Sequence, residues 1–369
     1  MRIPFNRPFL ADRELDYLTS AAAGGQTCGD GPFTGRATEL LTRLTGARSA
    51  LLTTSCTHAL EMSALLLDLR PGDEVIMPSF TFVSTANAYV LRGAVPVFVD
   101  CRPDTLNLDE RAVEAAVTPR TRAVVVVHYG GVACEMAAID KIARHHGIAV
   151  IEDNAHGLGG RYQGRPLGSL GALATQSFHA TKNVSCGEGG ALLINDDRLR
   201  ERAEIIREKG TDRSRFFRGQ VDKYRWMDLG SSYPPSDLLA AGLTAQLEAF
   251  EEIQRRRHAV WDAYDQAFAG RGMVVPPGRE HSAHLYYLLM PDLRTRQALI
   301  GHLADRGVQA AFHYQPLHSS PAGLRFGRTG PGGCPVTEDI ADRLVRLPLY
   351  AGLSDSDAAA VVEAVRSFG

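Results

Sequence analysis

Short apolar runs alternate with amphipathic segments along the first half of the chain. The apolar runs at residues 50–52, 95–99, 123–127 and 149–151 are typical of buried strands, and we expect a further strand over residues 175–178. Residues 59–67, 109–116 and 136–146 repeat apolar side chains with a helical period. Strands that alternate with helices imply right-handed crossovers and a mostly parallel sheet. The pattern therefore predicts an α/β fold for this large part of the chain.

A long amphipathic segment leads into the C-terminal part. We expect a helix from Ser236 to about Ala269, followed by a strand-like run at 285–290 and helical runs at 295–306 and 355–367. A length of 369 residues is typical of about two domains. We therefore expect an N-terminal arm and large domain over residues 1–245, and a linking helix with a smaller C-terminal α/β domain over residues 246–369.

Composition narrows the classes of function. The chain is 44% hydrophobic and 22% charged with a net charge of −2, which gives no general attraction to nucleic acid. No run approaches the roughly 18 apolar residues of a membrane helix, and residues 1–6 lack the apolar core of a signal peptide. The scattered cysteines have no metal-site or redox spacing, so we expect free thiols, no metal and a cytoplasmic location.

An acid and a lysine follow two of the predicted strands. Asp153 ends the apolar run that begins at residue 149, and Lys182 stands shortly after the run at 175–178. In an open parallel sheet, ligands bind beyond the carboxyl ends of strands, so both side chains can face one pocket. Pyridoxal phosphate needs such a pair: a lysine for the Schiff base and a carboxylate that keeps the pyridine nitrogen protonated. Taken singly, each residue is more often a solvated loop residue.

The turn after residues 50–52 is rich in hydroxyl groups and leads into a predicted helix. Residues 53–57, Thr-Thr-Ser-Cys-Thr, place free backbone N–H groups and the positive end of the helix dipole at one point, which suits a phosphate. In a second interpretation, Ser55 or Thr57 only caps the helix.

The order of these motifs resembles that of a known family. Residues 149–190, with the Gly-Glu-Gly-Gly run at 187–190, are similar to the sugar aminotransferases of the aspartate-aminotransferase fold (fold type I), the group named after the DegT, DnrJ, EryC and StrS proteins. The resemblance implies that Lys182 forms the Schiff base of pyridoxal phosphate and that Asp153 faces the pyridine nitrogen. It implies further cofactor contacts by Cys56 and Thr57 at the phosphate, Phe82 on the ring, His156 at the phenolic oxygen, and Ser177. Ser232 stands where much of the family has an asparagine that reaches the other subunit's cofactor phosphate, and its hydroxyl could donate instead.

A narrower resemblance covers nearly the whole chain. Residues 28–31, 127–129, 209–233 and 311–318 look like transaminases that act at C4 of dTDP-4-keto-6-deoxyglucose, including those that make dTDP-4-amino-4,6-dideoxygalactose. On residue type alone, the basic loop at 209–224 suits any anion or solvent, and the histidines of the C-terminal part suit structural positions. The resemblance implies substrate contacts by Arg213, Arg215, Arg218, His313, Tyr314 and His318.

The implied reaction is a transamination. The amino group of L-glutamate would pass to the cofactor and then to the keto sugar, with Lys182 as the general base of the proton shift. Loops such as 25–33 and 231–236 would draw residues from two chains, so we expect a homodimer. The alternatives are a transaminase acting at C3 of the sugar or on a cyclitol and, outside enzymes, a regulatory protein that retains the fold and cofactor. A 3-dehydratase is disfavoured, because such relatives replace the lysine with histidine.

Overall fold

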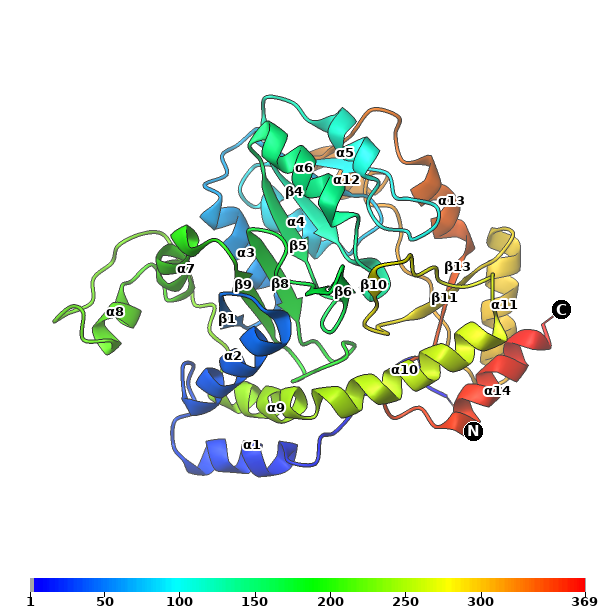
Figure 1. Cartoon of the computed structure of the whole chain (residues 1–369), viewed down its shortest axis with the longest axis horizontal. Helices are drawn as coiled ribbons and strands as arrows, with labels where there is room; N and C mark the ends of the chain where they lie inside the picture. Colours follow the sequence, from blue (N-terminus) through cyan, green and yellow to red (C-terminus); the bar gives the residue numbers. More distant parts are fainter. Residues whose placement is uncertain (1–2, 369) are drawn as a thin grey trace.

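The computed structural model describes residues 3–368 and centres on an eight-stranded sheet (Figure 1). In spatial order its strands are β1 (Ser49–Thr53), β9 (Gly190–Ile194), β8 (Leu173–Ser177), β5 (Ala149–Asp153), β4 (Thr121–Val127), β2 (Glu74–Pro78), β3 (Val95–Val99) and β12 (Arg328–Thr329). β9 runs antiparallel to both of its neighbours, and the other neighbouring strands are parallel. The predicted α/β fold with a mostly parallel sheet is confirmed.

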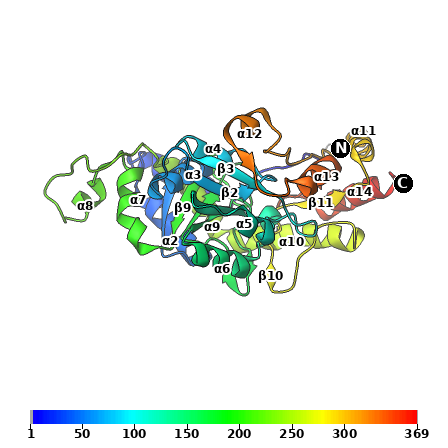
Figure 2. The same ribbon diagram turned by 90° about the horizontal axis from the view of Figure 1, so that it is seen from above.

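Helices cover both faces of the sheet (Figure 2). One face carries α3 (Cys56–Leu66), α4 (Ser84–Val90) and α7 (Arg200–Arg207), and the other carries α5 (Glu110–Ala116) and α6 (Met136–His146). In β2, Val75 and Met77 point into the apolar cluster under α3, while Ile76 points into the cluster under α6. Because successive side chains of a strand alternate between faces, a strand that is apolar throughout needs helices on both sides.

The helix expected over residues 236–269 is in fact two helices. They are α9 (Asp237–Glu248) and α10 (Phe250–Ala267), which meet at Ala249. α9 is mostly buried against α1 (Glu14–Ala23) and α2 (Pro32–Thr45), whereas α10 packs on α14 (Asp355–Arg366) and keeps charged side chains such as Arg255 exposed. The two helices therefore pack against different partners, α9 in the N-terminal part and α10 in the C-terminal part.

The C-terminal part is built around a two-stranded antiparallel sheet of β11 (Tyr286–Leu289) and β13 (Leu344–Leu347). Together with α10, α11 (Leu293–Asp305), α13 (Pro335–Arg343) and α14, it encloses an apolar cluster that includes Trp261, Tyr264 and Val361. The remaining elements are η1 (Tyr129–Gly131), η2 (Asp197–Leu199), β6 (Arg161–Tyr162), β7 (Arg165–Pro166), β10 (Arg279–Glu280), α12 (Pro321–Phe326) and α8 (Arg213–Phe217). Figures 1 and 2 both show α8 projecting away from the sheet.

Residues 3–368 contain neither a candidate membrane span nor a candidate metal site. No helix in this range is both long and apolar enough to span a membrane. No three or more His, Cys, Asp or Glu side chains in the same range are grouped so that they could hold a metal ion.

Gly190 lets β9 lie directly against the start of α3. A Cβ atom added to Gly190 would stand 2.3 Å from the backbone nitrogen of Cys56 and 2.3 Å from the carbonyl carbon of Ser55. These are backbone atoms, which cannot rotate away as the end of a flexible side chain can. The Gly-Glu-Gly-Gly run therefore fixes how closely the strand approaches the first turn of the helix.

We expect Gly190→Ala to lower the free energy of unfolding by about 1–3 kcal/mol, because the added methyl group has to displace backbone. Urea denaturation followed by circular dichroism measures the change. Gly301→Ala is the matched control: Gly301 lies in α11 with nothing within 4 Å of its added Cβ, and alanine favours a helix. Equal stability of the Gly190→Ala variant and the control would contradict this account of the close contact.

Candidate active site

The carboxyl ends of the parallel strands open onto a cavity of about 630 Å³. Asp153 is the last residue of β5 and Ser177 the last of β8, so both lie at the same edge of the sheet. Lys182 follows β8 and lines the same cavity. The structure thus brings together the strand-end acid and the lysine that the sequence singled out.

Lys182 has the properties of an amine that can lose its proton near neutral pH. Burial lowers the pKa of its Nζ to about 8, although the nearby Cys56 and Asp153 act in the opposite direction; the charge of Arg346 lowers it further. An unprotonated amine is a nucleophile and a base. The cavity therefore holds a lysine suited to bond an aldehyde and to carry a proton.

Asp153 is a buried carboxylate that lacks a cation in contact. Only 5% of the residue is exposed, and its Oδ2 accepts a hydrogen bond of 2.7 Å from the hydroxyl of Thr85. Burial raises the pKa of Asp153, and the Thr85 hydroxyl and the Ala155 backbone N–H oppose this. Among the residues that the structure describes, no lysine, arginine or histidine forms an ion pair with it. A protonated ring nitrogen would supply the missing charge.

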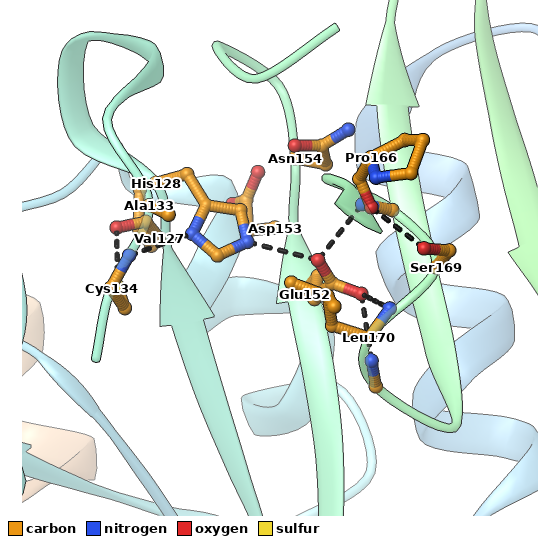
Figure 3. Close-up of polar contacts among 12 residues, drawn as sticks. Val127, His128, Ala133, Cys134, Glu152, Asp153, Asn154, Pro166, Ser169 and Leu170 are labelled. Carbon is orange, nitrogen blue, oxygen red and sulfur yellow. Dashed lines mark hydrogen bonds and ion pairs between the residues drawn. The ribbon is translucent and has the colours of Figure 1, made fainter. Parts of the chain in front are cut away.

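Glu152, next to Asp153, points to the opposite side of β5 and anchors the loop before β8 (Figure 3). Burial alone would raise the pKa of Glu152, but hydrogen bonds hold it below its ordinary value. The donors are Nε2 of His128 at 2.9 Å and the backbone N–H groups of Gly168 at 2.8 Å, Leu170 at 2.7 Å and Gly171 at 2.7 Å. A fully bonded Glu152 keeps the end of β5 rigid, and with it the position of Asp153.

The first turn of α3 faces the cavity with Cys56 and Thr57. Ser55 caps this helix, because its side chain accepts a hydrogen bond of 3.1 Å from the backbone N–H of His58. Capping and anion binding are compatible here, since one cap leaves other N–H groups of the first turn free. Burial raises the pKa of the Cys56 thiol to about 12, so the thiol stays protonated and a contact with phosphate would use its backbone.

Aromatic side chains form the wall above the sheet edge. Phe82 lines the cavity with 56% of its surface exposed, and its ring centre lies 6.2 Å from that of Tyr314. The hydroxyl of Tyr314 lies 3.3 Å from Nε2 of His156. Phe82 thus offers the open flat face that stacking on a pyridine ring requires.

His156 is an uncharged hydrogen-bond donor. The backbone N–H of Gly130 donates to its Nδ1 at 3.4 Å, which leaves the proton on Nε2. Burial first, and then the charge of Lys182, holds the pKa of His156 well below its usual range. A neutral Nε2–H beside Tyr314 suits a phenolic oxygen, the role that the resemblance implies.

Several predicted residues do not line the cavity. Ser232 is exposed and pairs in an isolated bridge with Glu208. The three predicted arginines pair with glutamates on or near α7: Arg213 with Glu208 at 3.0 Å, Arg215 with Glu201 at 3.2 Å and Arg218 with Glu204 at 2.8 Å. The segment at 209–224, expected to be a loop, contains the short helix α8.

The predicted residues of the C-terminal part divide into two groups. His313 and Tyr314 line the cavity. His318 does not: its Nδ1 lies 2.7 Å from the hydroxyl of Ser79 and its Nε2 lies 3.0 Å from Glu338. These contacts hold the segment that carries Tyr314 against β2, so His318 has a structural position.

The structure adds site residues that the sequence did not indicate. Arg346 enters the cavity from β13, and Phe5 and Asn6 line it from the N-terminal arm. Asn6 is held there by a hydrogen bond of 2.9 Å to the carbonyl of Ala180. Thr85 does not line the cavity, but its buried hydroxyl holds the Asp153 carboxylate. None of these residues follows a local motif, because each is brought to the site by contacts with distant parts of the chain.

The residues of the cavity fit pyridoxal phosphate. In the described part of the chain no cation pairs with the buried Asp153 carboxylate, and a lysine of lowered pKa lines the same cavity. A helix start with free N–H groups faces the same space. The fold and this cavity define a pyridoxal-phosphate-dependent aminotransferase of fold type I. The chain belongs to the DegT/DnrJ/EryC1/StrS aminotransferase family, whose model matches residues 8–366. The family resemblance drawn from the motifs is confirmed, and the protein is a sugar aminotransferase of this family.

Individual relatives cover almost the whole chain. The spore coat polysaccharide biosynthesis protein SpsC of Bacillus subtilis (strain 168) is 34% identical over 99% of this chain and 96% of its own length. The aminotransferase TlmJ from Streptoalloteichus hindustanus is 34% identical with a TM-score of 0.91, over 99% of this chain and 98% of that chain. Spr1654 from Streptococcus pneumoniae, in its PLP-form, is 26% identical with a TM-score of 0.91, over 100% and 98% of the two chains.

We expect Lys182→Ala to abolish turnover but to retain pyridoxamine phosphate. The bond to the cofactor needs the amine, whereas contacts with Asp153, Phe82 and the first turn of α3 do not. The amounts of product and of protein-bound cofactor are measured on the same preparation. Lys141→Ala, an exposed lysine of α6, is the control and should behave as wild type. Appreciable transamination by the Lys182→Ala variant would refute the assignment of this lysine.

Proposed function

We propose that this enzyme transfers the amino group of L-glutamate to C4 of dTDP-4-keto-6-deoxy-D-glucose. The products are 2-oxoglutarate and a dTDP-4-amino-4,6-dideoxyhexose of gluco or galacto configuration. One observation carries the proposal: residues 313–317, within a segment that resembles the C4 transaminases, line the cavity together with Lys182. The same segment would then contact the sugar at its reacting carbon.

We also propose which residues of the cavity would contact pyridoxal phosphate. When bound, pyridoxal phosphate supplies an electron sink for the reacting carbon. Asp153 would hold a proton on the ring nitrogen, and His156 would donate Nε2–H to the phenolic oxygen. Lys182 Nζ would take a proton from the α-carbon of glutamate. The backbone of Cys56 and Thr57, together with Ser177, would hold the phosphate side of the cofactor, and Phe82 would stack on its ring.

A homodimer is proposed to complete the site. Within one chain, neither Ser232 nor the arginines around α8 line the cavity. We therefore infer that these side chains contact the cavity of a second copy of the chain. Around them, Phe217 and Trp226 expose 69% and 83% of their surface, together with Tyr224 and Met227. Exposed apolar patches of this kind mark interfaces between proteins. In the second copy, the arginines would bind the diphosphate of the substrate and Ser232 the cofactor phosphate.

We also propose a division of the chain into two domains and a cytoplasmic location. A division into residues 1–245 and 246–369 is supported by the break at Ala249 and by the separate apolar cluster around β11 and β13. A cytoplasmic location is supported by the six free cysteines, of which Cys101, Cys134 and Cys334 are buried.

We expect dTDP-4-keto-6-deoxyglucose to be aminated at least about 100-fold faster than its 3-keto isomer or scyllo-inosose, because moving the ketone by one carbon misplaces it relative to Lys182. Holoenzyme and L-glutamate are incubated with each ketone, and 2-oxoglutarate is measured, with the Lys182→Ala variant as the blank. Equal or faster turnover of the 3-keto sugar or the cyclitol would overturn the C4 assignment and favour a C3 or cyclitol aminotransferase.

Ser232→Ala should weaken cofactor retention by about 1 kcal/mol, the value of one hydrogen bond, and the active species should sediment as a dimer. Ser231→Ala, the neighbouring exposed serine, is the control and should retain the cofactor as wild type does. A fully active monomer in sedimentation would contradict the proposed dimer. Equal cofactor retention in the two variants would remove Ser232 from the phosphate site.

A further inference from the structure

The ring of His156 is held mainly through one of its flat faces. The torsion that sets the plane of an imidazole is broad, so contacts have to fix that plane. The hydrogen bond from the Gly130 backbone N–H to Nδ1 is 3.4 Å long, and the hydroxyl of Tyr314 lies 3.3 Å from Nε2; both distances exceed those of strong hydrogen bonds. The ring of His284, in contrast, stacks on that of His156 with centres 4.1 Å apart and 21° between the planes. This stack is the close contact that fixes the plane.

His284 is itself fixed by a hydrogen bond of defined direction. Its Nδ1 lies 2.9 Å from Oδ1 of Asn183. Nδ2 of Asn183 donates to the carbonyl of Ser282 at 2.7 Å, and a carbonyl can only accept, so the amide oxygen is the atom that faces His284. His284 therefore carries its proton on Nδ1. Burial first, and then the proximity of His156, holds the pKa of His284 well below its usual range, so two neutral rings stack.

Helix α10 anchors this stack from the side of the C-terminal part. Nδ2 of Asn183 also donates to Oε1 of Gln254 at 2.9 Å. Arg257 donates from Nη2 to the backbone carbonyl of His284 at 2.7 Å. All of these side chains are buried, where hydrogen bonds are stronger than in water. Asn183 follows Lys182 directly in the chain, so the same anchor also holds the segment of the lysine.

We propose that His284 is a positioning residue that fixes the plane of His156, so that the Nε2–H of His156 points into the cavity. Both rings line the cavity, and each has one defined tautomer, with the proton on Nε2 in His156 and on Nδ1 in His284. A donor that is already oriented pays little to form its hydrogen bond. The proposal rests on the proposed function for the acceptor of this hydrogen bond, the phenolic oxygen of pyridoxal phosphate.

The first test measures, on the holoenzyme, the pH midpoint of the absorption change of bound pyridoxal phosphate. A donated hydrogen bond stabilises the ionised phenolic oxygen, so its loss should raise the midpoint by about one pH unit, the effect of one hydrogen bond to a charged group. His284→Asn keeps an N–H for Asn183 but removes the flat face, and it should raise the midpoint by as much as His156→Leu does. His284→Phe keeps the flat face, so its midpoint should stay close to that of wild type.

His281→Asn is the matched control for this measurement. His281 lies in the same segment, packs its ring on that of Trp261 with centres 4.0 Å apart, and does not line the cavity. The midpoint of this variant should equal that of wild type. A wild-type midpoint in His284→Asn, beside a raised one in His156→Leu, would overturn the proposal. Equal midpoints in His284→Asn and His284→Phe would also overturn it, because a flat face would then make no difference.

The second test is the crystal structure of each His284 variant as the holoenzyme. The ring of His156 should lose its single orientation in His284→Asn and keep it in His284→Phe. One unchanged orientation in both variants would overturn the proposal. If His156→Leu leaves the absorption midpoint unchanged, the proposed contact with the phenolic oxygen fails, and the orientation of the ring alone decides the role of His284. If His284→Asn does not fold, His284→Gln, which also lacks the flat face, provides the same comparison.

Discussion

The active site depends on keeping the Asp153 carboxylate ionised inside the protein. Burial opposes ionisation, and residues 3–368 offer this carboxylate the Thr85 hydroxyl and one backbone N–H but no ion pair. A protonated pyridine nitrogen bound at Asp153 would supply the positive charge that stabilises the ionised carboxylate. The neighbouring Glu152 needs no bound group to stay ionised, because side-chain and backbone donors of the chain satisfy its carboxylate. Two adjacent acids serve different purposes because a strand directs them to opposite faces.

The cavity joins elements that lie far apart along the chain. The start of α3 meets β9 at Gly190, where even a methyl group would collide with backbone. The small sheet contributes Arg346 from the other side, and the charge of this arginine helps to lower the pKa of Lys182.

Large apolar side chains are exposed at the cavity and on the segment around α8. Phe82 is more than half exposed at the cavity, and Trp226 exposes 83% of its surface. Helix α8 projects away from the sheet (Figures 1 and 2). The arginines of this segment pair with glutamates on or near α7, in partly exposed ion pairs. Such pairs are worth little in water, so these guanidinium groups would exchange a glutamate for a phosphate of the proposed substrate at small cost. In the proposed dimer, the second copy would cover Phe82 and the exposed side chains around α8.

The sequence alone determined the elements whose cause is local. The strand at 95–99 and the helix at 136–146 were predicted with their observed bounds, because apolar periodicity is a property of neighbouring residues. Asp153 and Lys182 could be placed at one pocket because parallel strands end at one edge. Only the tertiary structure divided the long helix at Ala249, gave His318 a structural position and brought Arg346 to the cavity. These features depend on packing between distant segments, for which no single stretch of sequence carries a signal.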